Sequence, residues 1–324
     1  MTTPHTGMRI GLDIMGSDHG PKVPIRASVQ AAQGLPEHVR LVLIGNEDAI
    51  REGLRAEGAD AQDFEIVPSQ DDITMGDHAS KALVNKPGSS IALGFRLLKT
   101  GQLDAFASTG NTGAMLVGSV MVLKPMPGVM RPCITSILPK ADGSFGLMVD
   151  VGANADCKPE MLFQFGLLGS LYAQHVYGLA TPKVGLLSIG EEEKKGNALT
   201  LAAHALMKGT DRFNFIGNVE GRDLFLDKAD VVVCDGFTGN VVLKALEGFH
   251  GLVKDRGGND PFLERFDYQN YGGTPVLGVD GTVMIGHGIS NEATVKNMLL
   301  LTSKVAQSKL HQRIGEAFHE PARP

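Results

Sequence analysis

The sequence predicts an α/β fold with a mostly parallel sheet and helices on both faces of that sheet. Short apolar or β-branched runs alternate along the chain with segments of helical periodicity, which is the order of strands and their crossover helices. Most strand-like runs are continuously apolar, as is typical of strands that are buried on both faces. The 324 residues suffice for two domains or for one large α/β unit, and we expect residues 1–324 to form a single catalytic unit.

Turn residues bound each expected element, and the length and periodicity between turns decide its type. The expected strands are residues 8–14, 41–44, 64–67, 103–108, 134–138, 146–149, 183–189, 213–216, 229–234 and 282–285. The expected helices are residues 23–33, 47–57, 89–99, 112–123, 159–177, 198–208 and 241–254, followed by a C-terminal helix at 291–318.

Three segments depart from simple alternation. Two expected strands flank the turn Lys140-Ala-Asp-Gly143, which predicts an antiparallel hairpin. A second hairpin-like or edge element is expected near residues 273–288. Residues 254–273 are polar, rich in glycine and without clear periodicity, and we expect a mobile excursion there.

Composition narrows the class of protein. The chain is 43% hydrophobic and 20% charged, as in ordinary globular proteins. It has no apolar run of about 18 to 20 residues and no basic start followed by an apolar core, so we expect a cytoplasmic protein. Its three cysteines lack CxxC spacing, which indicates neither a disulfide framework nor a zinc site. A net charge of −6 without a basic block argues against a general nucleic-acid binder.

The run DAFASTGNTGAML, residues 104–116, is the most informative stretch. Small and hydroxyl side chains replace bulky ones where a strand should meet a helix, and the free N–H groups at a helix start attract anions. Ser108, Gly110, Asn111 and Thr112 are therefore candidates for binding a phosphate. The alternative is an ordinary capped helix behind a tight turn.

Two further loops follow expected strands and carry polar residues. The first loop contains Asp13, Gly16 and Asp18; its glycines permit close backbone approach, and Asp18 could equally be a turn or cap residue. A later loop contains Asn154 and Lys158. A lysine at a helix start opposes the helix dipole, so Lys158 needs another reason to be there, such as neutralising an anion.

Two more loops and one histidine complete the candidate set. Glu191 and Asn197 lie in a charged loop for which a solvated turn is the ordinary interpretation. Asp235 and Asn240 repeat the pattern of strand, glycine turn and helix start. His287 stands between glycines at the end of the last strand, where a structural role is the common one. The carboxyl ends of parallel strands form the ligand crevice of such sheets, so we expect these loops to converge.

Several chemistries lack their sequence signals. The chain has no GxSxG elbow, no GxxxxGK followed by Ser or Thr, and no GxGxxG after the opening strand. Asp residues do not recur at the helical spacing that would hold a magnesium ion. We therefore expect no metal and no cofactor.

Taken in order, six motifs resemble the bacterial PlsX-type phosphate acyltransferases, and the resemblance runs from Met8 to about the C-terminal helix. The motifs are ASTGNTGA, GVMRP, VDVGANADCKPE, LSIGEEEKKGN, VCDGFTGNVVLKALEG and YGGTPVLGVDGTVMIGHG. The resemblance implies a homodimeric, Rossmann-like α/β fold related to isopropylmalate dehydrogenases and phosphate acetyltransferases. It also implies a reaction in which inorganic phosphate attacks the thioester of an acyl-[acyl-carrier-protein], giving acyl phosphate and free carrier protein for phospholipid synthesis.

That chemistry needs a held dianion and a stabilised oxyanion rather than a covalent nucleophile. We expect Ser108, Gly110, Asn111 and Thr112 to bind phosphate with help from Lys158 and Asn240. Backbone N–H groups of residues 13–16, or His287, would lie near the thioester. The predicted catalytic residues are Asn111, Lys158 and His287, and the predicted substrate-binding residues are Asp13, Gly16, Asp18, Ser108, Gly110, Thr112, Asn154, Glu191, Asn197, Asp235 and Asn240.

The implied carrier protein is acidic, so we expect a cationic docking patch despite the negative net charge. The candidates are Arg96, Lys99, Lys194, Lys195, Lys254, Arg256 and Arg265. Members of the resembled family often carry a longer apolar and basic insertion after the motif that ends at Gly248, which contacts membranes. The corresponding region is short in this chain, with Phe262, Leu263 and Phe266 as a small apolar face, so at most a weak peripheral membrane contact is expected. In the first loop, Ile14 and Ser17 occupy positions where the resembled family usually has the smaller residues Ala and Gly.

Three alternatives remain at this stage. A phosphate acetyltransferase-like enzyme would use acyl-CoA with much the same phosphate site. An NAD-dependent decarboxylating dehydrogenase shares the implied fold but needs a metal-binding Asp set and an Arg cluster, and neither is evident in the sequence. A noncatalytic scaffold would show no phosphate-dependent turnover.

Overall fold

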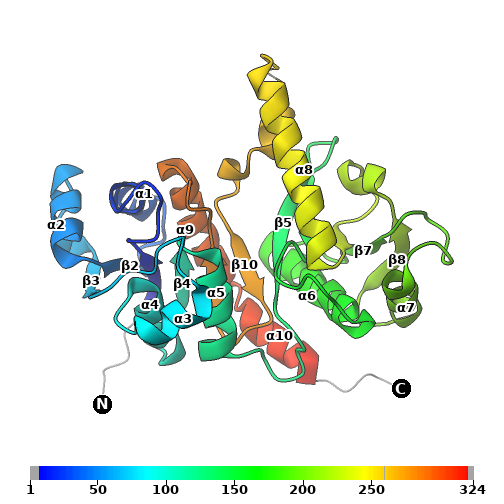
Figure 1. Ribbon diagram of the computed structural model, residues 1–324, viewed down its shortest axis with the longest axis horizontal. Coiled ribbons are helices and arrows are strands. Elements are labelled where there is room, and N and C mark those ends of the chain that lie inside the picture. Colours follow the sequence, from blue (N-terminus) through cyan, green and yellow to red (C-terminus); the bar gives the residue numbers. More distant parts are fainter. Residues whose placement is uncertain (1–6, 259, 320–324) are drawn as a thin grey trace. The chain divides into compact units, whose positions relative to one another are not determined.

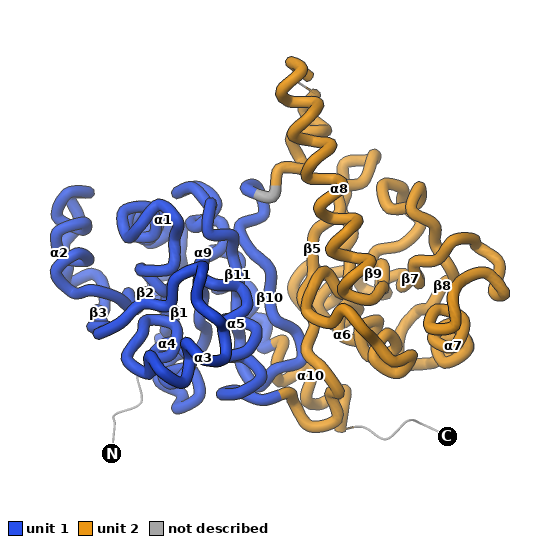
Figure 2. The backbone as a smooth tube through the Cα atoms, viewed as in Figure 1, with its two compact units in different colours: residues 1–124, 269–309 blue, residues 125–268, 310–324 orange. Residues whose placement is uncertain are grey.

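The computed structural model describes residues 7–258 and 260–319 (Figure 1). By its internal contacts the chain divides into two compact units (Figure 2). Unit 1 comprises residues 1–124 and 269–309, and unit 2 comprises residues 125–268 and 310–324. Each unit has its own sheet strands and its own covering helices.

Unit 1 has a mostly parallel sheet with the strand order β3-β2-β1-β4-β11-β10. Every neighbouring pair is parallel except β10 and β11. The strands are β1 (Met8–Asp13), β2 (Val39–Gly45), β3 (Glu65–Pro68), β4 (Ala105–Ser108), β10 (Thr274–Leu277) and β11 (Thr282–Ile285). The helices are α1 (Lys22–Ala32), α2 (Glu47–Ala56), α3 (Ala79–Asn85), α4 (Ser90–Lys99), α5 (Thr112–Gly118) and α9 (Glu292–Gln307), with a 3-10 turn at Ala61–Asp63 and a π-helical turn at Ser119–Leu123 that continues α5.

Unit 2 contains the strand order β5-β6-β9-β7-β8. An antiparallel hairpin of β5 and β6 is followed by parallel pairs. The strands are β5 (Cys133–Pro139), β6 (Phe145–Val149), β7 (Lys183–Leu187), β8 (Asn214–Val219) and β9 (Val231–Val233). The helices are α6 (Pro159–Tyr177), α7 (Ala198–Met207), α8 (Gly236–Asp255) and α10 (Leu310–His319), with 3-10 turns at Gly221–Phe225 and Leu263–Phe266; a further turn, Tyr268–Asn270, lies where the chain returns to unit 1.

The core of unit 1 explains why α4 packs closely on the sheet. Gly94 of α4 leaves no room for a side chain, because an added Cβ would lie 2.2 Å from the ring of Phe106 on β4. The Phe106 ring meets Phe95 edge to face, with centroids 5.3 Å apart, and both are fully buried. Such a pair contributes about 0.5–1.5 kcal/mol beyond the area it buries. This packing fixes α4, and with it Ser90, beside the ends of β1 and β4.

The α/β class, the mostly parallel strands and both expected antiparallel pairs are confirmed. Most strand ends differ from the expected ones by one or two residues, and three helices differ by more. The helix expected at 241–254 begins at Gly236, because Asp235 caps it. The helix expected at 112–123 is α-helical only as far as Gly118. The single helix expected at 291–318 is two helices, since Lys309 at φ 53° breaks it.

The structure adds detail to two other expectations. The short helix α3 (Ala79–Asn85) was not predicted from the sequence. In the segment 254–273, residue 259 lies outside the described residues, and the rest holds the two short 3-10 turns. The mobility of this segment stays a prediction. The expectation that residues 1–324 act as a single catalytic unit also stays a prediction, because it concerns how units 1 and 2 act together.

Candidate active site

The buried centre of the unit 1 site is Asp13, at the carboxyl end of β1. The Ser108 hydroxyl, at the end of β4, donates a 2.7 Å hydrogen bond to Asp13 Oδ2, and the Met15 N–H donates to Oδ1 at 2.9 Å. The Gly110 N–H then donates to Ser108 Oγ at 2.8 Å. A continuous chain of hydrogen bonds therefore joins the loops that follow two neighbouring parallel strands.

Two glycines let these loops touch. A Cβ added to Gly16 would lie 2.4 Å from Asp13 Oδ2 and 2.5 Å from the Gly110 Cα. A Cβ added to Gly110 would in turn lie 3.1 Å from the Gly16 Cα. The two backbones meet face to face, so any side chain at Gly16 would push the loops apart.

Burial sets the electrostatics of this centre. Asp13 is fully buried, and its burial raises the pKa of the carboxyl, which hydrogen bonds from Ser90, Ser108 and the Met15 N–H oppose. The like charge of Asp72 raises the pKa further. Three donors on one carboxyl make Asp13 a structural anchor of the loops.

Asn111 holds a neighbouring segment in place. Its Oδ1 accepts from the Ala114 N–H at 2.9 Å, which caps α5. Its Nδ2 faces the carbonyls of Thr74, Met75 and Asp77, at 3.0, 3.3 and 3.1 Å. Thr112, the next residue, is exposed at the first position of α5. The Asn111 side chain is thus occupied within the protein, while Thr112 faces solvent.

The last loop of unit 1 joins the same cluster. Gly286 donates its N–H to the Ser108 carbonyl at 2.9 Å, and Asp18 donates its N–H to the Gly288 carbonyl at 2.9 Å. A Cβ at Gly288 would lie 2.6 Å from Asp18 Oδ2. His287, between these two contacts, is exposed. Within unit 1 the predicted convergence of the loops at 13–18, 108–112 and 286–288 is therefore present.

Unit 2 has a second buried carboxylate, Asp150, at the end of β6. It accepts hydrogen bonds from the N–H groups of Ile134, Ala153 and Asn154, at 3.1, 3.3 and 2.7 Å, and from Asn154 Nδ2 at 2.9 Å. Burial raises the pKa of Asp150, and these hydrogen bonds oppose the rise. Asn154 also donates to the Pro132 carbonyl at 2.8 Å. Asp150 and Asn154 together fix the loop after β6.

The N-terminus of α8 rests on that loop. Asp235 caps the helix by accepting from the Thr238 N–H and hydroxyl, both at 2.8 Å. A Cβ at Gly239 would lie 2.0 Å from the Asp150 carbonyl oxygen. Asn240 is exposed, and its Nδ2 would lie 3.0 Å from a Cβ at Gly152. Unit 2 therefore brings Asp150, Asn154, Asp235 and Asn240 together.

The remaining predicted residues of unit 2 have separate surroundings. Lys158 is exposed at the start of α6 and forms no ion pair with any other residue that the structure describes. Glu191 pairs with Lys228 at 2.6 Å. Asn197 caps α7 by accepting from the Thr200 N–H at 2.9 Å. The contacts found for Glu191 and Asn197 in the described chain do not reach the Asp150 loop, so their substrate-binding roles stay predictions.

Sequence reasoning missed several residues that shape the two clusters. Ser90 and residues 74–77 lie in segments without a loop motif, and their roles depend on contacts with Asp13 and Asn111 that are distant in sequence. Gly236 and Gly239 stood inside a quoted motif, but their close approach to the Asp150 loop needs three-dimensional information. The glycine spacing at a helix start was the one available signal.

The cysteines are poor nucleophiles. Burial raises the pKa of Cys157 to about 11, and raises the pKa values of Cys133 and Cys234 as well. A thiol with a raised pKa stays protonated, and the thiolate is the reactive form. Among residues 7–258 and 260–319, no group of three or more His, Cys, Asp or Glu side chains has the arrangement of a metal site.

Comparison with known proteins identifies the family. A model of the family described as "Fatty acid synthesis protein" matches residues 8–255. Phosphate acyltransferase of Desulforamulus reducens is 42% identical, over 96% of this chain and 97% of its own length. Phosphate acyltransferase of Halothermothrix orenii is 41% identical, over 95% and 96% of the two chains. This chain belongs to the phosphate acyltransferase family.

Solved structures support the fold of this phosphate acyltransferase family member. EutD phosphotransacetylase from Staphylococcus aureus has a TM-score of 0.62 at 17% identity, over 94% of this chain and 95% of its own. A branched-chain phosphotransacylase from Enterococcus faecalis has a TM-score of 0.63 at 15% identity, over 94% and 99%. At these identities the likeness establishes a shared α/β fold. None of the helices in the described chain is both long enough and apolar enough to span a membrane.

Proposed function

We propose that this phosphate acyltransferase family member transfers the acyl group of an acyl-[acyl-carrier-protein] to inorganic phosphate, for phospholipid synthesis. The observation that carries the proposal is the similarity to phosphate acyltransferases over nearly the whole chain, at 42% identity for one of them. A phosphate oxygen forms a bond to the thioester carbonyl carbon, and the C–S bond breaks. The proton of hydrogen phosphate ends on the carrier thiolate, so acyl phosphate and free carrier thiol are the products.

Phosphate is itself the nucleophile in this reaction. The protein must hold the dianion against the carbonyl carbon and stabilise the oxyanion, which needs no covalent intermediate. The raised pKa values of all three thiols are in keeping with direct attack. We place the reaction in the cytoplasm, where a carrier protein would deliver the acyl group.

Within unit 1 we assign each residue a role from whether its polar groups are exposed or already hydrogen-bonded. Thr112, exposed at the start of α5, offers its hydroxyl and backbone N–H to phosphate. Ser108, Gly110 and Asn111 act as positioning residues, since their polar groups are engaged with Asp13 and with residues 74–77. The exposed His287 is proposed as a donor to the thioester oxygen.

In unit 2 the proposed anion ligands are Lys158 and Asn240. Lys158 carries an exposed positive charge without an ion-pair partner among the described residues, and Asn240 is exposed at the fifth position of α8. An ammonium group binds phosphate as a point charge. Asp150, Asn154 and Asp235 hold the loops that present these two side chains.

We propose that the active form is a homodimer and that α8 contributes to its interface. The side chains of Phe237, Val241, Phe249 and Leu252 recur along one face of α8, and each is more than half exposed. Such a stripe is typical of a helix that packs on a partner. Phe249→Glu is expected to shift the mass measured by light scattering from dimer to monomer, whereas Val84→Glu on unit 1 should leave it unchanged.

The test of the function is thiol release from acyl-[acyl-carrier-protein] with and without phosphate. We expect release only with phosphate, together with an acyl phosphate that hydroxylamine traps as a hydroxamate. Preference for a short acyl-CoA over the carrier substrate would favour a phosphate acetyltransferase. Formation of reduced nicotinamide cofactor with malate-like acids would favour a dehydrogenase, and absence of any turnover would favour a scaffold.

A further inference from the structure

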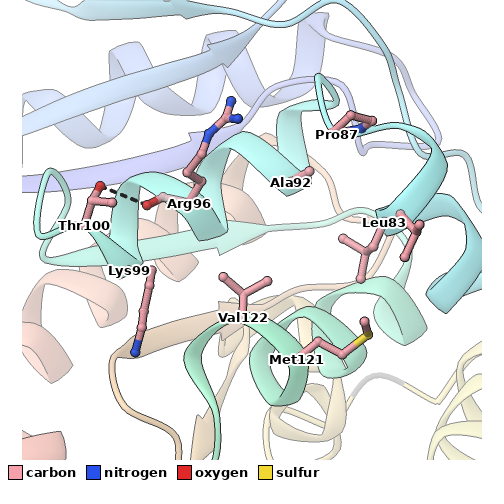
Figure 3. Close-up of a pocket in the computed structure, with 9 residues that line it drawn as sticks. Leu83, Pro87, Ala92, Arg96, Lys99, Thr100, Met121 and Val122 are labelled. Carbon is pink, nitrogen blue, oxygen red and sulfur yellow. Dashed lines mark hydrogen bonds between the residues drawn. The ribbon is translucent and has the colours of Figure 1, made fainter.

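An open apolar groove lies beside α4 in unit 1 (Figure 3). Its volume is about 330 Å³, and its walls come from α3, α4 and the π-helical turn after α5. We call it the α4 groove and define it by Leu83, Val84, Arg96, Lys99, Met121 and Val122. None of these residues belongs to the two loop clusters described above.

The walls of the α4 groove are more exposed than a small-molecule site allows. Val84 is 64% exposed and Met121 is 52% exposed. Small-molecule pockets commonly bury about 70–90% of their ligand, which walls this open do not achieve. Exposed apolar patches with a polar rim instead mark surfaces that bind proteins. The groove therefore suits apolar side chains on the surface of a partner.

Two cations on α4 line the same groove. Arg96 is exposed and forms no ion pair with any residue in the described part of the chain. The Lys99 Nζ lies 3.5 Å from Asp280 Oδ2 and 3.4 Å from the Leu123 carbonyl, and its side chain remains 43% exposed. The groove thus combines apolar walls with positive charge, which complements a partner surface that carries acidic and apolar side chains.

Two of the other cations that the sequence suggested for docking, Lys254 and Arg265, have partners. Lys254 lies 3.6 Å from a carboxylate oxygen of Glu264 and 3.8 Å from one of Asp267. Arg265 donates to the carbonyls of Lys140 and Ser144, at 3.1 and 2.5 Å. Because of these contacts, Lys254 and Arg265 are less available to bind an acidic partner. The guanidinium group of Arg96 has no such contact among the described residues and remains available.

The α4 groove also connects to the unit 1 loop cluster through α4. The helix begins at Ser90, whose hydroxyl hydrogen-bonds with Asp13. Arg96 follows six positions later, which is about 9 Å along the helix axis. A partner docked on the groove would therefore lie within two turns of helix from the loops proposed to bind phosphate. A thioester carried on a flexible arm could span that distance.

We infer that the α4 groove docks the acidic carrier protein of the proposed reaction. The inference rests on the proposed function, because that function supplies the acidic partner. With a net charge of −6 the enzyme repels acidic proteins at long range, so docking requires a local cationic surface. Acidic side chains of the carrier face Arg96 and Lys99, and an apolar side chain of the carrier enters between Val84 and Met121.

The test reverses the charge of Arg96. Because like charges placed opposite each other repel, Arg96→Glu should raise KM for acyl-[acyl-carrier-protein] by at least about tenfold. KM for phosphate should not change. Arg55→Glu is the matched control, since Arg55 is exposed on α2 of the same unit and lies outside the groove. Val84→Asp should also raise KM for acyl-[acyl-carrier-protein], because it places a charge in the apolar wall of the groove.

Direct binding of unacylated carrier protein, followed by fluorescence anisotropy at two salt concentrations, separates docking from catalysis. The wild type should bind more weakly at high salt, and Arg96→Glu should lose both affinity and salt dependence. If Arg96→Glu matches Arg55→Glu in KM and in binding, the docking inference is wrong although the function stands. Failure of the wild type to release thiol with phosphate would instead refute the proposed function.

Discussion

The Ser108 hydroxyl donates a 2.7 Å hydrogen bond to the buried carboxylate of Asp13. These residues lie 95 positions apart, at the ends of β4 and β1. The hydroxyl also accepts from the Gly110 N–H at 2.8 Å. Ser108 therefore links Asp13 to the turn that precedes α5. Thr112, the first residue of α5, is proposed to bind phosphate.

Removal of this hydroxyl should destabilise unit 1. In Ser108→Ala the buried carboxylate loses a donor, and we expect the free energy of unfolding to fall by about 1–3 kcal/mol. Urea denaturation measures the change. Ser119→Ala is the control, because that buried hydroxyl donates to the Met115 carbonyl within its own helix, and that carbonyl keeps a backbone donor. Equal losses in the two variants would contradict a special role for the pair.

Asp13 should also make stability depend on pH. Its burial raises the carboxyl pKa in the folded state, so the folded chain binds more protons than the unfolded chain above about pH 4. Stability should therefore fall as pH rises from the unfolded value through the raised folded value. Asp13→Asn cannot ionise, so its stability relative to the wild type should increase over that window. Urea titrations at a series of pH values test this, and a difference independent of pH would count against it.

Local patterns in the sequence were enough to predict most strands and helices. Asn111 does cap the helix that follows it, as one interpretation of its motif allowed. The caps at Asn197 and Asp235 were not predicted, and the start of α8 was therefore placed too late. The break at Lys309 was not predictable, since nothing in the apolar periodicity marks a residue with positive φ. The helix α3 was missed because it is short and half exposed.

The sequence was enough to predict which loops form the candidate site, but not which residues contact one another within it. Gly16 and Gly110 were each singled out, yet only the fold reveals that their backbones touch. Asn111 was expected to bind phosphate, but three carbonyls from residues 74–77 face its side-chain amide. Such partners are set by tertiary packing, which a pattern of local spacing does not contain.

The amide of Asn111 should control the segment at 74–77. Asn111→Asp keeps the cap acceptor for α5 but places a carboxylate against three carbonyls. We expect faster hydrogen exchange in residues 72–78 and a higher KM for phosphate. Asn46→Asp is the matched control, because Asn46 caps α2 through the same kind of bond to the Ala49 N–H. Unchanged exchange at 72–78 would show that the amide does not hold the segment.

Lys158 should affect phosphate without affecting folding. Its side chain is exposed and has no ion-pair partner in the described chain, so Lys158→Met should leave the unfolding midpoint nearly unchanged. Loss of the Lys158 ammonium group should raise KM for phosphate severalfold. It should also make KM for phosphate less dependent on salt concentration. Lys296→Met on α9 serves as the control, and KM values for phosphate that are the same in both variants would remove Lys158 from the proposed anion site.

Gly239 should tolerate no side chain, because α8 begins directly on the Asp150 loop. A Cβ there would lie 2.0 Å from the Asp150 carbonyl oxygen and 2.9 Å from Cys234 Sγ, and neither backbone nor buried thiol can move cheaply. We expect Gly239→Ala to lose about 1–3 kcal/mol or more of unfolding free energy. Gly251→Ala in the same helix meets nothing within 4 Å and should gain up to about 1 kcal/mol from helix propensity. Urea unfolding of both variants decides the matter, and a stabilised Gly239→Ala would mean that α8 does not pack on the Asp150 loop as described.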